Sequence, residues 1–142
     1  MSDRTPQGRY KIFSGAILER KDGRILCQKR DRNPKIAFPG YWTCIPGGHV
    51  MRGETPRRAV RREIFEEFRL KIGGLRFCEK MTEPQGEARG IYYFFMGKVT
   101  VDKNGLQCHE GEKAGFFEPA RILKLRLHPV SRKFFKRYVL KV

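Results

Sequence analysis

The chain has 142 residues and a formal net charge of +16, from 31 lysines and arginines against 15 aspartates and glutamates. Its 39% hydrophobic and 12% aromatic residues suffice for a packed core and exclude general disorder. The length predicts one domain over residues 1–142, with a loose end at residues 1–8. The charge favours polyanionic partners, namely phosphorylated metabolites, nucleic acid such as RNA, or an anionic membrane surface, and does not choose among them.

The cysteines indicate the redox compartment. Cys27, Cys44, Cys78 and Cys108 form no C-x-x-C pair, which argues against a zinc site. Each lies in or beside an apolar run, so we expect buried free thiols in a reducing compartment. The sequence contains no apolar stretch of 18 residues and no signal-peptide core. We therefore expect a cytoplasmic protein that does not bind membranes.

The first part of the chain predicts short strands. Residues 10–29 read as a β-hairpin, two strands joined at the turn Lys21-Asp22-Gly23. Residues 31–41 contain two prolines and a glycine, so they are predicted as a loop. Residues 42–45 form a short apolar strand, which the turn Pro46-Gly47-Gly48 is predicted to stop.

A helix is predicted to follow. Thr55 is a suitable N-cap, and Pro56 suits the first helical position. Val60, Ile64 and Phe68 recur every four residues, which gives the helix one face to bury.

The remaining elements complete a mixed fold. Residues 91–101 are the strongest strand signal and are apolar on both faces, which predicts a central strand. We expect one of its aromatic pairs, Tyr93 with Phe95 or Tyr92 with Phe94, to line a pocket. Further strands are predicted at residues 75–81 and 115–117, and helices at residues 119–125 and 129–140. Without regular β-α-β alternation, this order predicts an α+β fold in which helices cover a mixed sheet.

Three glutamates crowd one side of the first helix. Glu63, Glu66 and Glu67 share a face, and Glu54 stands one loop earlier. Their repulsion costs only about 0.2–0.5 kcal/mol per pair on a solvated helix. It rises to roughly 3 kcal/mol per pair for partly buried carboxylates about 6 Å apart at an effective dielectric near 20. A positive group is therefore expected among them, either arginine or a divalent cation.

Facing carboxylates suit a particular chemistry. Hard oxygen ligands on a rigid helix favour Mg²⁺, or Mn²⁺ as a substitute, which bridges carboxylates to substrate phosphates. Such an ion neutralises charge on phosphoryl oxygens and polarises water for attack. Gly47 and Gly48 allow the backbone to approach a metal or a phosphate closely, and Arg62 is placed to pair with Glu66. The alternative is an ordinary surface helix with mixed arginine and glutamate.

The spacing matches a known pattern. Gly48, five residues, Glu54, seven residues and then residues 62–67 (REIFEE) closely resemble the Nudix box, G-x5-E-x7-R-E-U-x-E-E-x-G-U, where U is apolar. Leu70 fits the last apolar position, but Arg69 replaces the final glycine. Because arginine prefers to continue a helix, we expect the helix to run on and end near Gly73-Gly74.

The resemblance implies a fold and an activity. The Nudix fold is a mixed sheet between helices, an α/β/α arrangement in which the box forms a loop–helix–loop. The lead-in segments Gly40-Tyr41-Trp42 and Pro46-Gly47-Gly48 also resemble the family. The implied activity is Mg²⁺-dependent hydrolysis of a nucleoside diphosphate linked to another moiety.

The resemblance also implies residue roles. The metal ligands would be Glu63, Glu66, Glu67 and the carbonyl of Gly47, with Glu67 the first choice for catalysis. Arg62 would orient the catalytic carboxylates, and Glu54 would support the loop. Many members add a later acidic residue, for which Glu110 is preferred to Glu112.

The substrate lies outside the box. Gly48 is predicted to contact phosphate, and Phe38 or Tyr41 to stack on a base. By analogy with compact family members, we expect a free nucleoside triphosphate, including oxidised ones, to give a monophosphate and pyrophosphate. Alternatives are an RNA 5′-end pyrophosphohydrolase, a nucleotide-sugar or ADP-ribose hydrolase, and a non-catalytic nucleic-acid-binding module.

Overall fold

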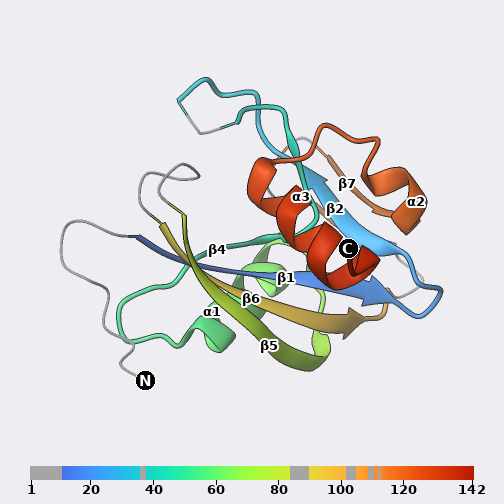
Figure 1. Cartoon of the computed structure of the whole chain (residues 1–142). Helices are drawn as coiled ribbons and strands as arrows, with labels where there is room; N and C mark the ends of the chain where they lie inside the picture. Colours follow the sequence, from blue (N-terminus) through green and yellow to red (C-terminus); the bar gives the residue numbers. More distant parts are fainter. Residues whose placement is uncertain (1–10, 36–37, 84–89, 102–104, 109–110, 112) are drawn as a thin grey trace.

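A computed structural model describes residues 11–35, 38–83, 90–101, 105–108, 111 and 113–142 of the chain (Figure 1). Its strands are β1 (Lys11–Arg20), β2 (Ile25–Lys29), β3 (Trp42–Thr43), β4 (Gly47–His49), β5 (Ile72–Glu83), β6 (Gly90–Val99) and β7 (Lys113–Phe117). Its helices are α1 (Pro56–Phe68), α2 (Pro119–Ile122) and α3 (Pro129–Phe135), which continues as the π-helix η1 (Lys136–Leu140).

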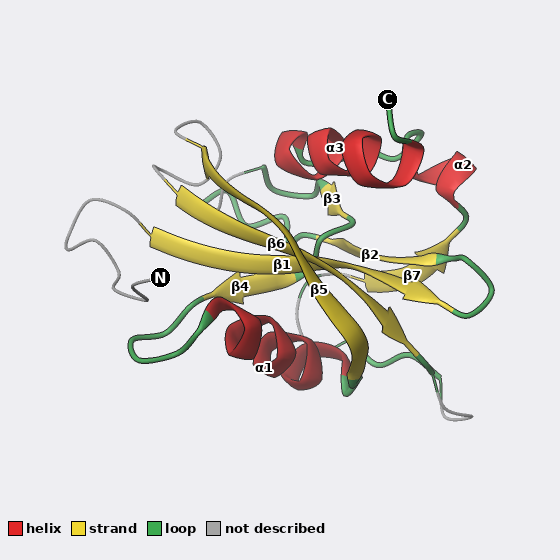
Figure 2. Ribbon diagram, turned by 60° about the horizontal axis from the view of Figure 1, so that its bottom comes forward, coloured by secondary structure: helices red, strands yellow, loops and turns green. Residues whose placement is uncertain are grey.

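The strands form one mixed sheet in the order β3-β2-β1-β6-β5, with β4 added beside β1 and β7 beside β2. The central pair, β1 and β6, is parallel, and the other pairs are antiparallel. Helix α1 covers one face of the sheet and α3 covers the other (Figure 2). The α+β prediction of a mixed sheet between helices is therefore confirmed.

The strand β6 is central and buried on both faces, as predicted. Tyr93 and Phe95 point to the α1 side, where they join the core that Val60 and Ile64 enter from the helix. Tyr92 and Phe94 point to the other side and pack against α3. Aromatic side chains on both faces hold the two helical layers to this strand.

The Pro-Gly-Gly segment is not simply a turn, which corrects the prediction. Gly47–His49 forms β4, and Gly47 lies opposite Gly15 of β1. A Cβ atom on Gly47 would lie 2.0 Å from the Ser14 carbonyl oxygen, so only glycine permits this approach. The preceding strand is shorter than predicted, because β3 ends at Thr43.

The helix end also differs from the prediction. Helix α1 stops at Phe68, and Arg69 itself takes the left-handed conformation, with φ 56° and ψ 32°. Its N–H donates to the Phe65 carbonyl oxygen at 2.9 Å. The expected extension to Gly73-Gly74 is wrong, because Leu70 and Ile72 are buried in the core on leaving the helix. Their burial outweighs the preference of arginine for a right-handed helix.

This cap gives a testable expectation. Glycine adopts the left-handed conformation without the Cβ penalty, so Arg69→Gly is expected to be more stable than Arg69→Ala by about 1 kcal/mol. Both variants lose the contact of the Arg69 guanidinium with the Phe65 ring, 5.4 Å from its centroid, so their difference isolates the backbone. Urea unfolding measures it, and equal stabilities would contradict the left-handed cap.

His128 caps the last helix. Its Nδ1 accepts a hydrogen bond of 3.1 Å from the Val130 N–H, and the side chain is buried against the Phe38 ring. Burial, with a smaller contribution from the charge of Arg30, lowers the pKa of His128 to about 4. The folded protein therefore holds this imidazole neutral.

We expect acid to destabilise the fold through His128. Its folded pKa lies below its ordinary value, so its stability contribution is complete above about pH 6.5 and is lost as the pH falls toward 4. At pH 5 the loss is about 2 kcal/mol relative to pH 7.5. His128→Asn retains a capping acceptor without a titrating ring, so it should lack this loss in urea unfolding. The same loss of stability in His128→Asn as in wild type would contradict this role of His128.

The four cysteines are free thiols, but they are not all buried as expected. Cys27 and Cys44 are fully buried, which raises the pKa of both and brings that of Cys44 to about 11. Cys78 is half-buried and Cys108 is exposed. In the part of the chain that the structure describes, no helix is long and apolar enough to cross a membrane.

Candidate active site

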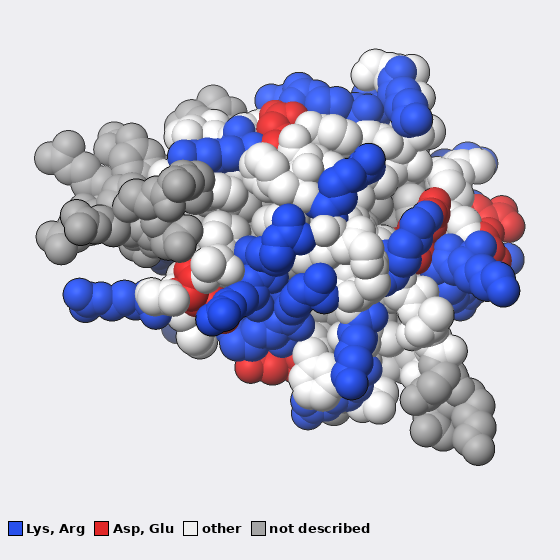
Figure 3. All heavy atoms as spheres, turned by 90° about the horizontal axis from the view of Figure 1, so that it is seen from below, with Lys and Arg blue, Asp and Glu red and all other residues white. Residues whose placement is uncertain are grey.

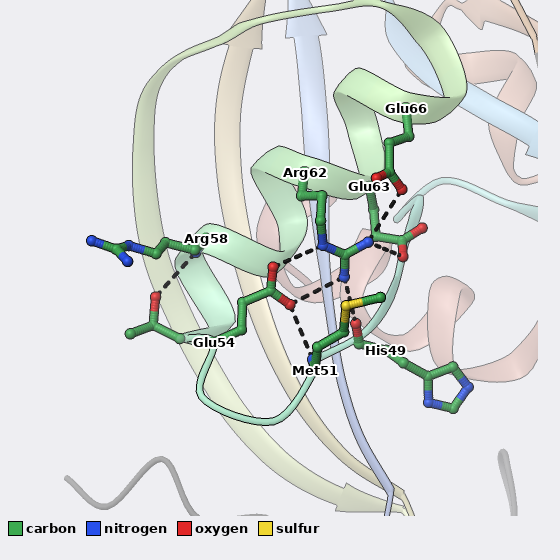
Figure 4. Close-up of polar contacts among 8 residues, drawn as sticks. His49, Met51, Glu54, Arg58, Arg62, Glu63 and Glu66 are labelled. Carbon is green, nitrogen blue, oxygen red and sulfur yellow. Dashed lines mark hydrogen bonds and ion pairs between the residues drawn. The ribbon is translucent and has the colours of Figure 1, made fainter.

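The box side chains meet at Arg62, which lies on α1 (Figure 4). Its guanidinium binds Glu54 twice, through Nε to Oε2 at 2.7 Å and Nη2 to Oε1 at 3.1 Å. Nη1 donates to Oε1 of Glu63 at 2.9 Å and to Oε1 of Glu66 at 3.2 Å. One arginine thus supplies the positive charge that the crowded carboxylates were expected to need.

Arg62 also connects the helix to β4 and the loop that follows it. Nη2 donates to the His49 carbonyl oxygen at 3.1 Å. In the loop, Oε1 of Glu54 accepts from the Met51 N–H at 3.0 Å. Thr55 then starts the helix, its hydroxyl accepting from the Arg58 N–H at 3.2 Å. Hydrogen bonds therefore hold the loop at both ends. The supporting role of Glu54 stays a prediction.

The contacts of Arg62 shift the pKa values of two groups, Glu54 and Arg62 itself. The hydrogen bonds from Arg62 hold the pKa of Glu54 below its ordinary value, despite some burial. The same contacts, with those to Glu63, raise the pKa of Arg62 further above its usual range. Arg62, Glu54 and Glu63 are each less than a quarter exposed, whereas Glu66 is 56% exposed. Glu66 therefore extends from the cluster toward solvent.

Gly48 makes room for Glu63. A Cβ atom on Gly48 would lie 2.6 Å from Cδ of the Glu63 carboxyl group. Gly48 lies opposite Ser14 in the pairing of β4 with β1, so this carboxylate is held against the sheet. Glu67 is on the inner side of the helix and only 4% exposed. The three glutamates thus differ in exposure: Glu66 is exposed, Glu63 is half-buried and Glu67 is buried.

The donor set suits a hard divalent cation, since carboxylate oxygens are the ligands Mg²⁺ prefers. Among the described residues, no three His, Cys, Asp or Glu side chains are grouped closely enough to hold one ion. Glu63 and Glu66 turn instead toward Arg62. Coordination by Glu63, Glu66 and Glu67 therefore stays a prediction, as does a contribution from the Gly47 carbonyl.

The other predicted site residues have separate positions. Glu110 and its alternative Glu112 lie outside the described residues. Phe38 and Tyr41 do lie together, with ring centroids 5.3 Å apart. The Arg126 guanidinium lies 4.3 Å from the Tyr41 ring centroid, a partner that the sequence analysis did not identify. Arg126 is 85 positions from Tyr41, so no local sequence pattern predicts this contact. The positive charge of Arg126 was the one sequence feature that pointed to a binding role.

Comparison with known proteins assigns the family. The model of the NUDIX domain matches residues 10–138 of this chain. The chain belongs to the Nudix family. It is thus a Nudix hydrolase, a class that acts on anhydrides of phosphorus-containing compounds and generally uses a divalent metal.

Relatives of this Nudix hydrolase carry several names. An uncharacterized Nudix hydrolase of Listeria monocytogenes is 30% identical over 119 residues, which are 84% of this chain and 70% of that protein. A Mycobacterium tuberculosis protein provisionally named 8-oxo-dGTP diphosphatase 2 is 39% identical over 45% of this chain and 42% of its own length. The human NAD-capped RNA hydrolase NUDT12 is 31% identical over 68% of this chain and 20% of its own length.

The fold also matches solved Nudix structures. The crystal structure of the MutT protein from Methanosarcina mazei has a TM-score of 0.76 and covers 96% of this chain and 98% of its own. The two sequences are 24% identical, so this likeness concerns the fold.

Proposed function

We propose that this Nudix hydrolase is an Mg²⁺-dependent pyrophosphohydrolase that converts nucleoside triphosphates, including oxidised ones, to the monophosphate and pyrophosphate. The observation that carries the proposal is the binding of the box carboxylates Glu54, Glu63 and Glu66 by Arg62, with Glu63 against Gly48. The fourth box carboxylate, Glu67, is buried on the same helix. It speaks against a non-catalytic module, which would have no need of this buried and half-buried acidic set.

In the proposed reaction, the ion would be held by Glu63, Glu66, Glu67 and the Gly47 carbonyl. When bound, Mg²⁺ supplies positive charge to the phosphoryl oxygens and polarises water. Arg62 fixes the side chains of Glu63 and Glu66 through Nη1. The Glu67 carboxylate accepts a proton from the attacking water, whose oxygen bonds to phosphorus as the bond to the leaving pyrophosphate breaks.

Substrate selection is assigned to the backbone and to aromatic rings. The Gly48 backbone lies beside the Glu63 carboxylate, so we propose that it approaches the diphosphate. The proposed base-stacking residues are Phe38 and Tyr41, whose rings form a pair beside the Arg126 charge.

The experiment is a hydrolysis panel with Mg²⁺. It contains ordinary and oxidised nucleoside triphosphates, dinucleotides, nucleotide sugars, ADP-ribose and 5′-triphosphate RNA. Because one relative is named an 8-oxo-dGTP diphosphatase, we expect this chain to hydrolyse an oxidised purine triphosphate fastest. We expect nucleoside monophosphate and pyrophosphate as products. Preferential cleavage of a nucleotide sugar or ADP-ribose would refute the proposed substrate class and leave the hydrolase assignment intact.

A second candidate is hydrolysis at an RNA 5′ end. The net charge of +16 favours it, and so does the similarity to an NAD-capped RNA hydrolase. In that case, added salt should lower activity on RNA much more steeply than activity on a free nucleotide. Equal salt dependence would rule this candidate out.

A further inference from the structure

A second surface, away from the Arg62 cluster, has the features of a binding site. A cavity of about 240 Å³ lies where the start of α1 meets β5 and β6. It is lined by Thr55, Pro56, Arg57, Phe77, Tyr93 and Phe95. Phe77 is 46% exposed, which is unusual for so large an apolar side chain.

A β-bulge in β5 creates this surface. Phe77 pairs with Phe95 and Glu79 pairs with Phe94, so Cys78 is an extra residue between them. The extra residue places Phe77 and Lys80 on the same face, above the aromatic pair of β6. It turns Glu79 to the other face, where Arg137 Nη1 and Tyr138 Oη each lie 2.6 Å from its carboxylate. The bulge thus removes an acidic side chain from the cavity face and adds a lysine.

Positive groups surround these rings. The Arg57 guanidinium lies 5.3 Å from the Phe95 ring centroid, and Lys80 Nζ lies 5.6 Å from that of Tyr93. Arg57 is held in place, because its Nη1 donates to the Leu75 carbonyl oxygen at 2.6 Å. On the face seen in Figure 3, Lys and Arg predominate over Asp and Glu among the charged side chains, and uncharged residues lie between them. Aromatic faces bordered by cations are complementary to bases joined by phosphates.

We propose that this surface binds single-stranded RNA, with an unpaired base stacked on Phe77 and adjacent phosphates contacting Lys80 and Arg57. A single strand is required because a base inside a duplex cannot present its face to a ring. Arg57 and Arg61 turn toward carbonyl oxygens of β5, whereas Arg62 turns toward β4. The surface therefore lies on a different side of α1 from the carboxylate cluster, and the proposal does not depend on the proposed reaction.

The test measures binding of an oligouridine of about ten nucleotides by fluorescence anisotropy. The probe carries a 5′-hydroxyl and a 3′-dye, so it offers no 5′-phosphates to the active site. Phe77→Leu keeps an apolar side chain but removes the ring, and we expect its Kd to rise about tenfold. Phe77→Trp should restore binding to within about twofold of wild type, since stacking accepts any ring. The matched control is Phe65→Leu, an exposed phenylalanine that also lies beside an arginine.

A salt series tests the phosphate contacts. Lys80→Gln should reduce the slope of log K against log salt by about 0.7, the value for one phosphate contact to a single strand. Lys124→Gln removes an exposed lysine elsewhere and should leave the slope unchanged. Equal reductions in both variants would mean that binding is spread over the charged surface, which would overturn the assignment.

Further outcomes would overturn the proposal or assign the surface to another partner. Unchanged affinity in Phe77→Leu, or an equal loss in Phe65→Leu, would overturn the proposal. If Phe77→Leu instead dissociates a dimer in sedimentation without affecting RNA affinity, the surface binds a second copy of the chain. Thermal unfolding shows whether each variant is folded. If Phe77→Leu is unfolded, Phe77→Trp and Lys80→Gln still test the proposal. Loss of RNA binding in a folded Phe77→Trp protein would contradict stacking.

Discussion

Glu67→Gln is expected to reduce Mg²⁺-dependent hydrolysis on the order of 10³-fold while leaving the fold intact. Glutamine has almost the same shape, so it fills the same buried space on the inner side of α1. It has no negative charge for a cation and does not accept a proton from water. The change therefore removes the proposed chemistry without creating a cavity.

Turnover of the best substrate in the hydrolysis panel measures this effect, and thermal unfolding confirms the fold. Glu118→Gln is the control. Glu118 is an exposed acid, and its ion pair with Arg24 is long, at 3.4 Å. Wild-type turnover in Glu67→Gln would refute the assignment of Glu67. A wild-type protein without turnover on any substrate in the panel would instead favour a non-catalytic binding module.

Arg62→Ala is expected to lower both stability and activity. The variant loses the hydrogen bonds to Glu54, Glu63 and Glu66 and leaves their negative charges facing one another. We expect the free energy of unfolding to fall by about 2 kcal/mol, since hydrogen bonds between charged groups typically contribute this much. Arg62→Lys should recover only part of the loss, because an ammonium group cannot bind Glu54 through two parallel donors.

Urea unfolding with and without Mg²⁺ measures the effect. Once the arginine is gone, a divalent cation is the remaining positive charge for these carboxylates, so Mg²⁺ should stabilise Arg62→Ala more than wild type. Arg58→Ala is the matched control, an exposed arginine one turn earlier on the helix. Equal stability of the Arg58 and Arg62 variants would contradict the role of Arg62 in holding the cluster.

Features that depend on local pattern could be predicted from the sequence. The start of α1 follows from Thr55 and Pro56, whose roles are set by neighbouring backbone groups. Its buried face follows from the four-residue spacing of Val60, Ile64 and Phe68. The contact of Arg62 with Glu66, four positions later, follows from helical geometry. Its contact with the adjacent Glu63 does not, because neighbouring residues of a helix point in different directions. Helical geometry does not predict the contact of Glu54 with Arg62, because eight positions separate them and Glu54 precedes the helix. The supporting role of Glu54 came only from its match to the box and stays a prediction.

The remaining features depend on packing between distant segments. Arg69 ends the helix because the core takes in the residues after it, which intrinsic propensity cannot reveal. Gly47 lacks a side chain, so its backbone can approach β1 closely and pair with it. The Pro-Gly-Gly segment that was predicted as a turn therefore contributes a strand. The bulge at Cys78 reverses the faces of the residues that follow it, and an alternating pattern read without the bulge assigns them wrongly.

The parallel pairing of β1 with β6 has a consequence for how the protein folds. It places Lys11 opposite Gly90, so the centre of the sheet joins segments that are far apart in the sequence. Loop closure over such a separation is slow, and contacts of this kind place a domain among the slower folders. By contrast, the contacts of Arg62 with Glu54 and His49 span few residues. The carboxylate cluster can therefore form early, and it becomes a rigid site only when the last strand of the central pair closes the sheet.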